Sequence, residues 1–163
     1  MTLDSSSSAT TSLTSTVNST SNSFGVEIPF VQLLGIEMRW FENGASELAY
    51  TPSPDHMNSF QVAHGGAVMT LLDVTMATAA RSVDKGMGIV TIEMKTSFMR
   101  PGKGALRATG RLLHRTATMA FTEGSVFDAS GKLCIHATGT FKFVPRLPTS
   151  PTSTQPLNRI ATD

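Results

Sequence analysis

Three residues between positions 58 and 73 have the types that attack on a carbonyl carbon requires. Asp73 is the only ionisable side chain between Gly66 and Ala80. Burying a carboxylate among apolar residues costs on the order of several kcal/mol unless the group is paired, hydrogen-bonded or partly hydrated. Asp73 therefore needs an explanation, and it could act as a nucleophile or a general base. Gly65 offers a backbone N–H as an oxyanion donor, with Gly66 as a second donor. Asn58, in the preceding loop, could orient the reacting groups.

The segment from Gly66 to Ala80 must position these residues. It contains no proline and no further glycine, and apolar residues cover nearly every face, which predicts a buried helix ending near Ser82. Gly65 and Asp73 would then lie roughly 12 Å apart along one helix. That separation is too large for both to touch one carbon atom. If both act, Asp73 comes from a second chain with an antiparallel helix, and two equivalent sites lie on a twofold interface.

The rest of the chain predicts an α+β arrangement, with an antiparallel sheet packed on that helix and its last three strands in a meander. Alternation places Thr91 with Glu93 and Lys95 on one face of a strand, and Cys134 on the polar face of another. The expected elements are a helical turn at Pro29–Leu34 and strands at Ile36–Phe41, Ser46–Tyr50, Met87–Phe98, Ala105–Arg115, Thr118–Asp128 and Leu133–Phe143.

Composition divides the chain into three parts. Residues 1–23 form a Ser/Thr-rich segment that predicts disorder, residues 24–144 one folded domain, and residues 145–163 a second disordered tail. A net charge of +1 gives no indication of nucleic-acid binding, and no apolar run is long enough to span a membrane. Cys134 is the single cysteine, which excludes an internal disulfide and a cysteine metal cluster. With no export signal, we expect a cytoplasmic protein.

The spacing Asn58…His64-Gly65-Gly66…Asp73, with the predicted element order, resembles the hotdog-fold acyl-CoA thioesterases, in particular the phenylacetate-degradation and 4-hydroxybenzoyl-CoA thioesterase branch. The resemblance covers about residues 30–144, including Ser-Phe-Met-Arg-Pro at 97–101. It implies a sheet wrapped around one long helix, and homodimers joined edge to edge that often form a dimer of dimers. It also implies an acyl-CoA substrate, cleaved to a free acid and CoA, with no metal or other cofactor.

The same resemblance assigns roles to further residues. Thr91 corresponds to a hydroxyl that assists the acidic residue in some relatives, whereas the hydroxyl that others carry one helical turn after the acid is Ala77 here. We expect a medium-length or aryl acyl group. The candidate substrate-binding residues are Phe60, Val68, Met69 and Leu72 for the acyl group, Arg100, Lys103 and Arg115 for the CoA phosphates, and His64 and Gly66 at the loop–helix junction.

Other interpretations remain open at this stage. The glycine pair could be only a close packing point, and Asp73 could be a structural carboxylate held by a loop or by Arg81. His64 would permit a hotdog hydratase or dehydratase, which needs a histidine with an acidic partner. The chain could also be a binding module that holds an acyl-CoA without turning it over.

Overall fold

The computed structural model describes residues 24–145, so the two predicted tails lie outside the described residues, except for Pro145. No helix within this part is long and apolar enough to cross a bilayer. The elements, in chain order, are α1 (Pro29–Leu33), β1 (Glu37–Glu42), β2 (Ala45–Tyr50), a 3-10 turn η1 (Pro54–His56), α2 (Gly65–Arg81), β3 (Met87–Phe98), β4 (Leu106–Arg115), β5 (Met119–Phe127) and β6 (Leu133–Pro145).

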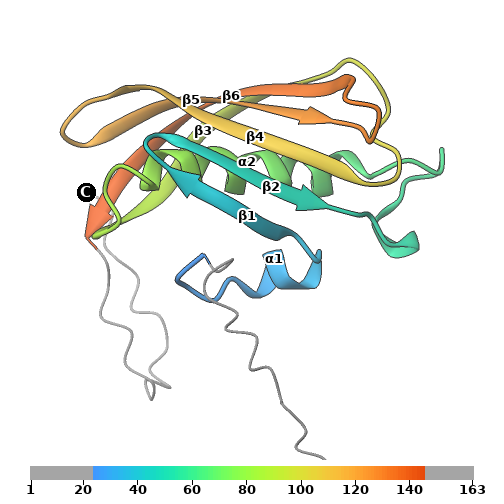
Figure 1. Cartoon of the computed structure of the whole chain (residues 1–163), viewed down its shortest axis with the longest axis horizontal. Coiled ribbons are helices and arrows are strands. Elements are labelled where there is room, and N and C mark those ends of the chain that lie inside the picture. Colours follow the sequence, from blue (N-terminus) through green and yellow to red (C-terminus); the bar gives the residue numbers. More distant parts are fainter. Residues whose placement is uncertain (1–23, 146–163) are drawn as a thin grey trace, which may run out of the picture.

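The strands form one antiparallel sheet in the order β1-β2-β4-β5-β6-β3. Strands β4, β5 and β6 form the predicted meander, whereas β3 crosses over to pair with β6 and becomes an edge strand. Helix α2 runs across the inner face of the curved sheet, and α1 lies near β1 (Figure 1). The predicted α+β fold, with an antiparallel sheet wrapped around one long helix, is therefore confirmed.

Helix α2 approaches the sheet closely because glycines occupy the inner face of the central strands. A Cβ atom on Gly110 of β4 would lie 2.7 Å from the Thr75 carbonyl oxygen, and one on Gly124 of β5 would lie 3.0 Å from Leu72 Cδ2. The Ser46 hydroxyl also donates a 2.7 Å hydrogen bond to the Thr75 carbonyl. These contacts fix the height of α2 above the sheet, and with it the positions of the side chains on its outer face.

A β-bulge in β3 changes which face of the sheet Thr91 occupies. Pairing with β6 shifts register between Thr91 and Glu93, so Ile92 is the extra residue. Thr91 stands opposite Phe141, which is buried beneath the helix, and Thr91 therefore faces α2. The prediction that Thr91 shares a face with Glu93 and Lys95 is wrong, because uninterrupted alternation does not hold across the bulge.

Cys134 also departs from its predicted position. It is buried, with 1% of its surface exposed, although alternation placed it on the polar face of β6. Val126 pairs with Ile135 while Phe127 pairs with Leu133, so Cys134 is the extra residue of a second bulge. The side chain turns into the core, and its carbonyl accepts hydrogen bonds from the Met99 and Arg100 N–H groups.

Candidate active site

The N-terminus of α2 presents one backbone N–H to a cleft. His64 caps the helix: its Nδ1 accepts a 3.0 Å hydrogen bond from the Gly66 N–H, and its own N–H donates to the His56 carbonyl. The Gly65 N–H meets no protein acceptor within residues 24–145. Gly65 therefore keeps a donor at the positive end of the helix dipole. The Gly66 N–H, expected as a second donor, is not available to a ligand because it already donates to His64 Nδ1.

Asn58 organises the loop that leads into the helix. Its side-chain Oδ1 accepts hydrogen bonds from the Phe60 N–H at 2.9 Å and the Val62 N–H at 3.4 Å. The backbone N–H of Asn58 donates to the Val62 carbonyl. The carbonyl half of the side chain is thus engaged in the loop. The amide nitrogen is the group left to donate toward a ligand.

Asn58 and Gly65 line the same open cleft, which has a volume of about 630 Å³. Its other walls come from the loop before α2 and from the turn after β3. The Phe98 ring lies 3.4 Å from the point where a Cβ atom on Gly65 would stand, so it borders Gly65 closely. The remaining lining residues are Phe60, Val62, Ala63, Val68, Met99, Arg100, Pro101, Gly102, Lys103 and Ile135.

The rim of this cleft is basic. Arg100 and Lys103 line it and also line an adjoining groove that includes Lys132 and Asp128. The Arg100 guanidinium donates a 2.7 Å hydrogen bond to the Leu133 carbonyl, which holds it beside the groove. Lys132 was not among the predicted site residues, because only the pairing of β6 with the turn after β3 brings it to this groove.

Asp73 lies about two helical turns beyond Gly65 and forms a pair with Thr91. The Thr91 hydroxyl donates a 2.6 Å hydrogen bond to Asp73 Oδ1. Burial raises the pKa of Asp73 above its ordinary value, and the hydrogen bond from Thr91 offsets part of this rise. A carboxylate with a raised pKa, held by a hydroxyl at the edge of a cavity, has the features expected of a catalytic group.

The two halves of the predicted site do not meet within one chain. Asp73 and Thr91 line a second cavity, of about 590 Å³, whereas Gly65 and Asn58 line the first cleft. The walls of the second cavity are mostly apolar and include a segment that the sequence analysis left unassigned. The alternation of Phe24, Val26 and Ile28 was the available signal for that segment, which lies beside Asp73 only in the tertiary structure.

The predicted acyl-binding residues are dispersed. Phe60, 81% exposed, and Val68 line the cleft beside Gly65. Met69 is 38% exposed on the outer face of α2 and lines neither cavity. Leu72 is 0% exposed, packs in the core against the sheet and lines neither cavity. A helix with apolar residues on nearly every face does not reveal which of them face the sheet.

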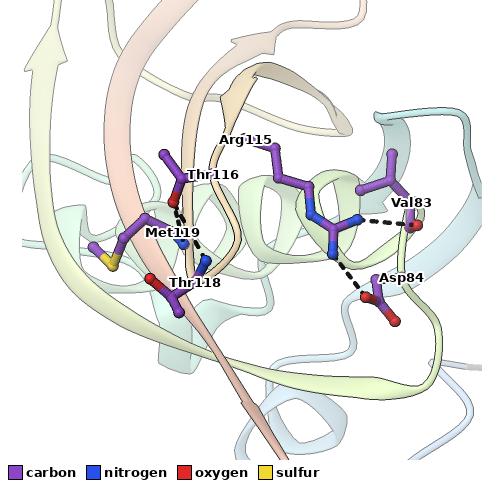
Figure 2. Close-up of polar contacts among 6 residues, drawn as sticks. All are labelled: Val83, Asp84, Arg115, Thr116, Thr118 and Met119. Carbon is purple, nitrogen blue, oxygen red and sulfur yellow. Dashed lines mark hydrogen bonds and ion pairs between the residues drawn. The ribbon is translucent and has the colours of Figure 1, made fainter.

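Arg115 has structural partners instead of the predicted position beside the cleft (Figure 2). Its Nη2 lies 2.7 Å from Asp84 Oδ2, and its guanidinium lies 4.6 Å from the Phe143 ring centroid. The Thr116 hydroxyl accepts a hydrogen bond from the Met119 N–H within the adjacent turn (Figure 2). Arg115 thus ties the β4–β5 turn to the segment after α2, at the opposite end of that helix from Gly65. Arg115 does not line the Gly65 cleft of its own chain, and its assignment to the CoA phosphates stays a prediction.

No group of three or more His, Cys, Asp and Glu side chains within residues 24–145 is arranged to hold a metal ion. The groups that the two cavities offer for chemistry are a backbone donor, an amide, a hydroxyl and a carboxylate. Together these groups could polarise a carbonyl oxygen and deliver either a carboxylate oxygen or a water molecule to its carbon.

Comparison with known proteins agrees with this chemistry. Residues 60–135 match the Thioesterase superfamily. A relative from Saccharolobus solfataricus, provisionally named an esterase, is 29% identical over 109 residues, which are 66% of this chain and 73% of the relative. Human acyl-coenzyme A thioesterase 13 is 30% identical over 82 residues, 48% of this chain and 59% of that protein. The aligned part is thus less than two thirds of the human protein.

Solved structures show the same fold. A conserved protein of Pseudomonas aeruginosa has a TM-score of 0.69 at 28% identity, covering 72% of this chain and 95% of that chain. The PaaI protein from the phenylacetic acid degradation operon of E. coli has a TM-score of 0.66 at 23% identity, covering 71% of this chain and 83% of that chain. The fold is the predicted hotdog fold. Residues 60–135 match the thioesterase superfamily, and the predicted enzyme class, a thioester hydrolase, is confirmed.

Proposed function

We propose that this protein hydrolyses acyl-CoA thioesters to a free acid and CoA, at two equivalent sites in a homodimer. The observation that carries the proposal is the division of the site along α2. Gly65, whose N–H has no acceptor within residues 24–145, lines one cavity, and the Asp73–Thr91 pair lines another. The thioesterase name of the human relative supports an acyl-CoA substrate.

An edge-to-edge dimer would bring the two halves together. Strand β3 is an edge strand, and Val90, Ile92 and Phe98 on it are exposed apolar residues. An edge strand is a template for pairing with another chain. Antiparallel pairing of β3 with its own copy would set the two α2 helices side by side in opposite directions. Asp73 of the partner subunit could then approach the Gly65 N–H.

In the proposed reaction the thioester carbonyl oxygen accepts a hydrogen bond from the Gly65 N–H. This bond strengthens as negative charge develops on the oxygen, and the helix dipole adds to it. Asp73 of the partner subunit attacks the carbonyl carbon or removes a proton from an attacking water molecule. Thr91 orients that carboxylate, and the Asn58 amide nitrogen donates to the substrate or the water. The C–S bond then breaks and the CoA thiolate leaves, later taking up a proton. Where the carboxylate itself attacks, the acyl group remains on Asp73 of the partner subunit as a mixed anhydride, and a water molecule then hydrolyses this anhydride to release the free acid.

The basic rim supplies a place for the CoA nucleotide. Arg100, Lys103 and Lys132 surround one groove continuous with the Gly65 cleft. Cationic side chains make charge-assisted hydrogen bonds to phosphate oxygens. CoA bound there would extend its thioester end toward Gly65.

The hydratase alternative gains no support from His64. Its Nδ1 already accepts the hydrogen bond that caps α2, which gives this histidine a structural function. A measurement of turnover distinguishes the binding-module alternative from the proposal, because a binding module would hold an acyl-CoA without hydrolysing it.

The deciding experiment measures thiol release from a panel of short, medium, long and aryl acyl-CoAs, with Asp73→Asn beside the wild type. We expect turnover of at least one substrate and a loss of about a hundredfold or more in the variant. Binding without turnover across the panel would instead identify a binding module. Turnover that does not depend on Asp73 would show that another residue carries the chemistry.

A further inference from the structure

We propose that the cavity beside Asp73 is the acyl-binding pocket and that residues 24–28 form its specificity-determining wall, with Ala77 as the side chain that sets its depth. This inference rests on the proposed function, because it places the acyl half of the same thioester. It concerns a segment outside the part of the chain that matches the superfamily.

The lining of the cavity suits an alkyl or aryl group. Phe24, Val26 and Ile28 form one wall, and Val74 and Ala77 of α2 face the same space. Ile89, Val90, Val144 and Pro145 close it from β3 and β6. A volume of about 590 Å³ lies within the range of about 300–1,000 Å³ that is typical of small-molecule sites. The cavity can thus remove an apolar acyl group from water.

The wall is attached to the helix that carries the carboxylate. Arg81, in the last turn of α2, donates from Nη1 to the Phe24 carbonyl. A Cβ atom on Gly25 would stand 3.5 Å from Arg81 Nη2, so the backbone of this segment lies directly against the guanidinium. Residues 24–28 are therefore positioned relative to Asp73 through one rigid helix.

The charged residues of the two cavities differ, and this difference indicates which cavity binds the CoA phosphates and which binds the acyl group. The cleft beside Gly65 has Arg100 and Lys103 at its rim, which suits the phosphates of CoA. The cavity beside Asp73 has a carboxylate at its edge, which would repel phosphates, and its one arginine already binds the Phe24 carbonyl. The acyl group therefore enters the second cavity, and the reacting carbon lies between them.

Ala77 occupies the position that limits the depth of this pocket. It lies one helical turn beyond Asp73 on the same face of α2 and is half-buried in the cavity wall. A larger side chain there would project into the space that a long acyl group needs. Leucine keeps the helical propensity of this position, so Ala77→Leu can narrow the pocket without breaking the helix.

The test compares kcat/KM on acetyl-, hexanoyl-, decanoyl-, palmitoyl- and phenylacetyl-CoA for the wild type, Ala77→Leu and Ile28→Ala. Ala77→Leu should lower kcat/KM on the longest substrate that the wild type accepts by roughly tenfold or more relative to its kcat/KM on acetyl-CoA. Ile28→Ala should shift the profile toward longer or bulkier groups. Leu33→Ala is the matched control, because Leu33 is a nearby exposed apolar residue outside the cavity and should leave the profile unchanged.

A second readout separates this inference from the proposed function. Binding of non-hydrolysable thioether analogues of the same acyl-CoAs, measured by calorimetry, should show the same loss for long chains in Ala77→Leu. Binding of free CoA should not change. If the wild type turns over no thioester, the proposed function fails, while the analogue affinities still decide where the acyl group lies. A profile unchanged in both variants, or a loss equal for every chain length and for free CoA, would overturn the pocket assignment.

Discussion

The Thr91 hydroxyl donates a 2.6 Å hydrogen bond to the Asp73 carboxylate, joining edge strand β3 to the middle of helix α2. This contact depends on the bulge at Ile92, which turns Thr91 toward the helix. The bond opposes the rise in the pKa of Asp73 that burial causes. Thr91 is therefore positioned both to orient the carboxylate and to keep it ionised.

Replacing Thr91 should move the acidic limb of the pH–rate profile. Asp73 must be ionised to act, so kcat/KM should fall as the pH drops through its pKa. Thr91→Val removes the hydrogen bond that lowers this pKa, and the limb should move to higher pH with a reduced plateau. Thr91→Ser keeps the hydroxyl and should retain the wild-type limb. A purely structural role would predict equal behaviour of the two variants.

Asp73→Asn should stabilise the fold at neutral pH while removing activity. Because burial raises the pKa of Asp73, the folded chain binds this proton more tightly than the unfolded chain does. The stability that protonated Asp73 contributes is therefore fully present at a pH below its pKa in the unfolded chain. It is lost as the pH rises through its pKa in the folded chain. The neutral amide avoids this loss, so the Tm of the variant should exceed that of the wild type at neutral pH. The difference in Tm between the variant and the wild type should shrink at acidic pH. A Tm of Asp73→Asn below that of the wild type at neutral pH would contradict the prediction.

The Gly65 N–H can be removed without breaking the helix. Proline suits the first helical position, and His64 before it has φ −59° and ψ 136°, which a following proline permits. Gly65→Pro should lower kcat by about 10²–10³-fold if this donor stabilises the oxyanion. Gly65→Ala keeps the N–H, and its Cβ atom would lie 3.4 Å from the Phe98 ring, so it should lose much less activity. Circular dichroism would confirm that both variants fold.

Mixing two inactive variants tests whether each site is built from two chains. Asp73→Asn retains Gly65, and Gly65→Pro retains Asp73. Unfolding and refolding the two together should produce mixed dimers in which one of the two sites is intact. With random pairing, activity should return to about a quarter of the wild-type value, because the twofold interface makes the two sites equivalent. No recovery in a mixture that chromatography shows to contain mixed dimers would mean that each site lies within one chain.

Gly110→Ala should lower the free energy of unfolding more than Gly86→Ala does. Its Cβ atom would stand 2.7 Å from the Thr75 carbonyl oxygen, and α2 or β4 must shift to accept it. Overpacking of this kind costs about 1–3 kcal/mol. At Gly86 the same atom would be 3.6 Å from the Asp84 carboxylate, so Gly86→Ala should change the free energy of unfolding by about 0.5 kcal/mol or less. Urea denaturation of the two variants would check the difference.

Local sequence patterns were enough to predict the elements that carry the site. The apolar run after Gly65 predicted the helix, and the predicted ranges of the first two strands and of the last strand agree with the structure within a few residues. Short-range chemistry determines these features, because helical periodicity, turn conformation and strand alternation depend on residues close together in the chain. The resemblance that Asn58, Gly65 and Asp73 carry also implied the class of enzyme.

Only the tertiary structure decided which groups work together. Two bulges, at Ile92 and Cys134, each reversed a predicted face, because a bulge depends on how one strand pairs with its neighbour. The packing of α2 on the sheet buried Leu72, and the ion pair with Asp84 placed Arg115 at the far end of that helix. Residues 24–28 meet Asp73 because Arg81 holds them across a long sequence separation. Such contacts are not encoded in local periodicity, since they arise only when distant elements share one core.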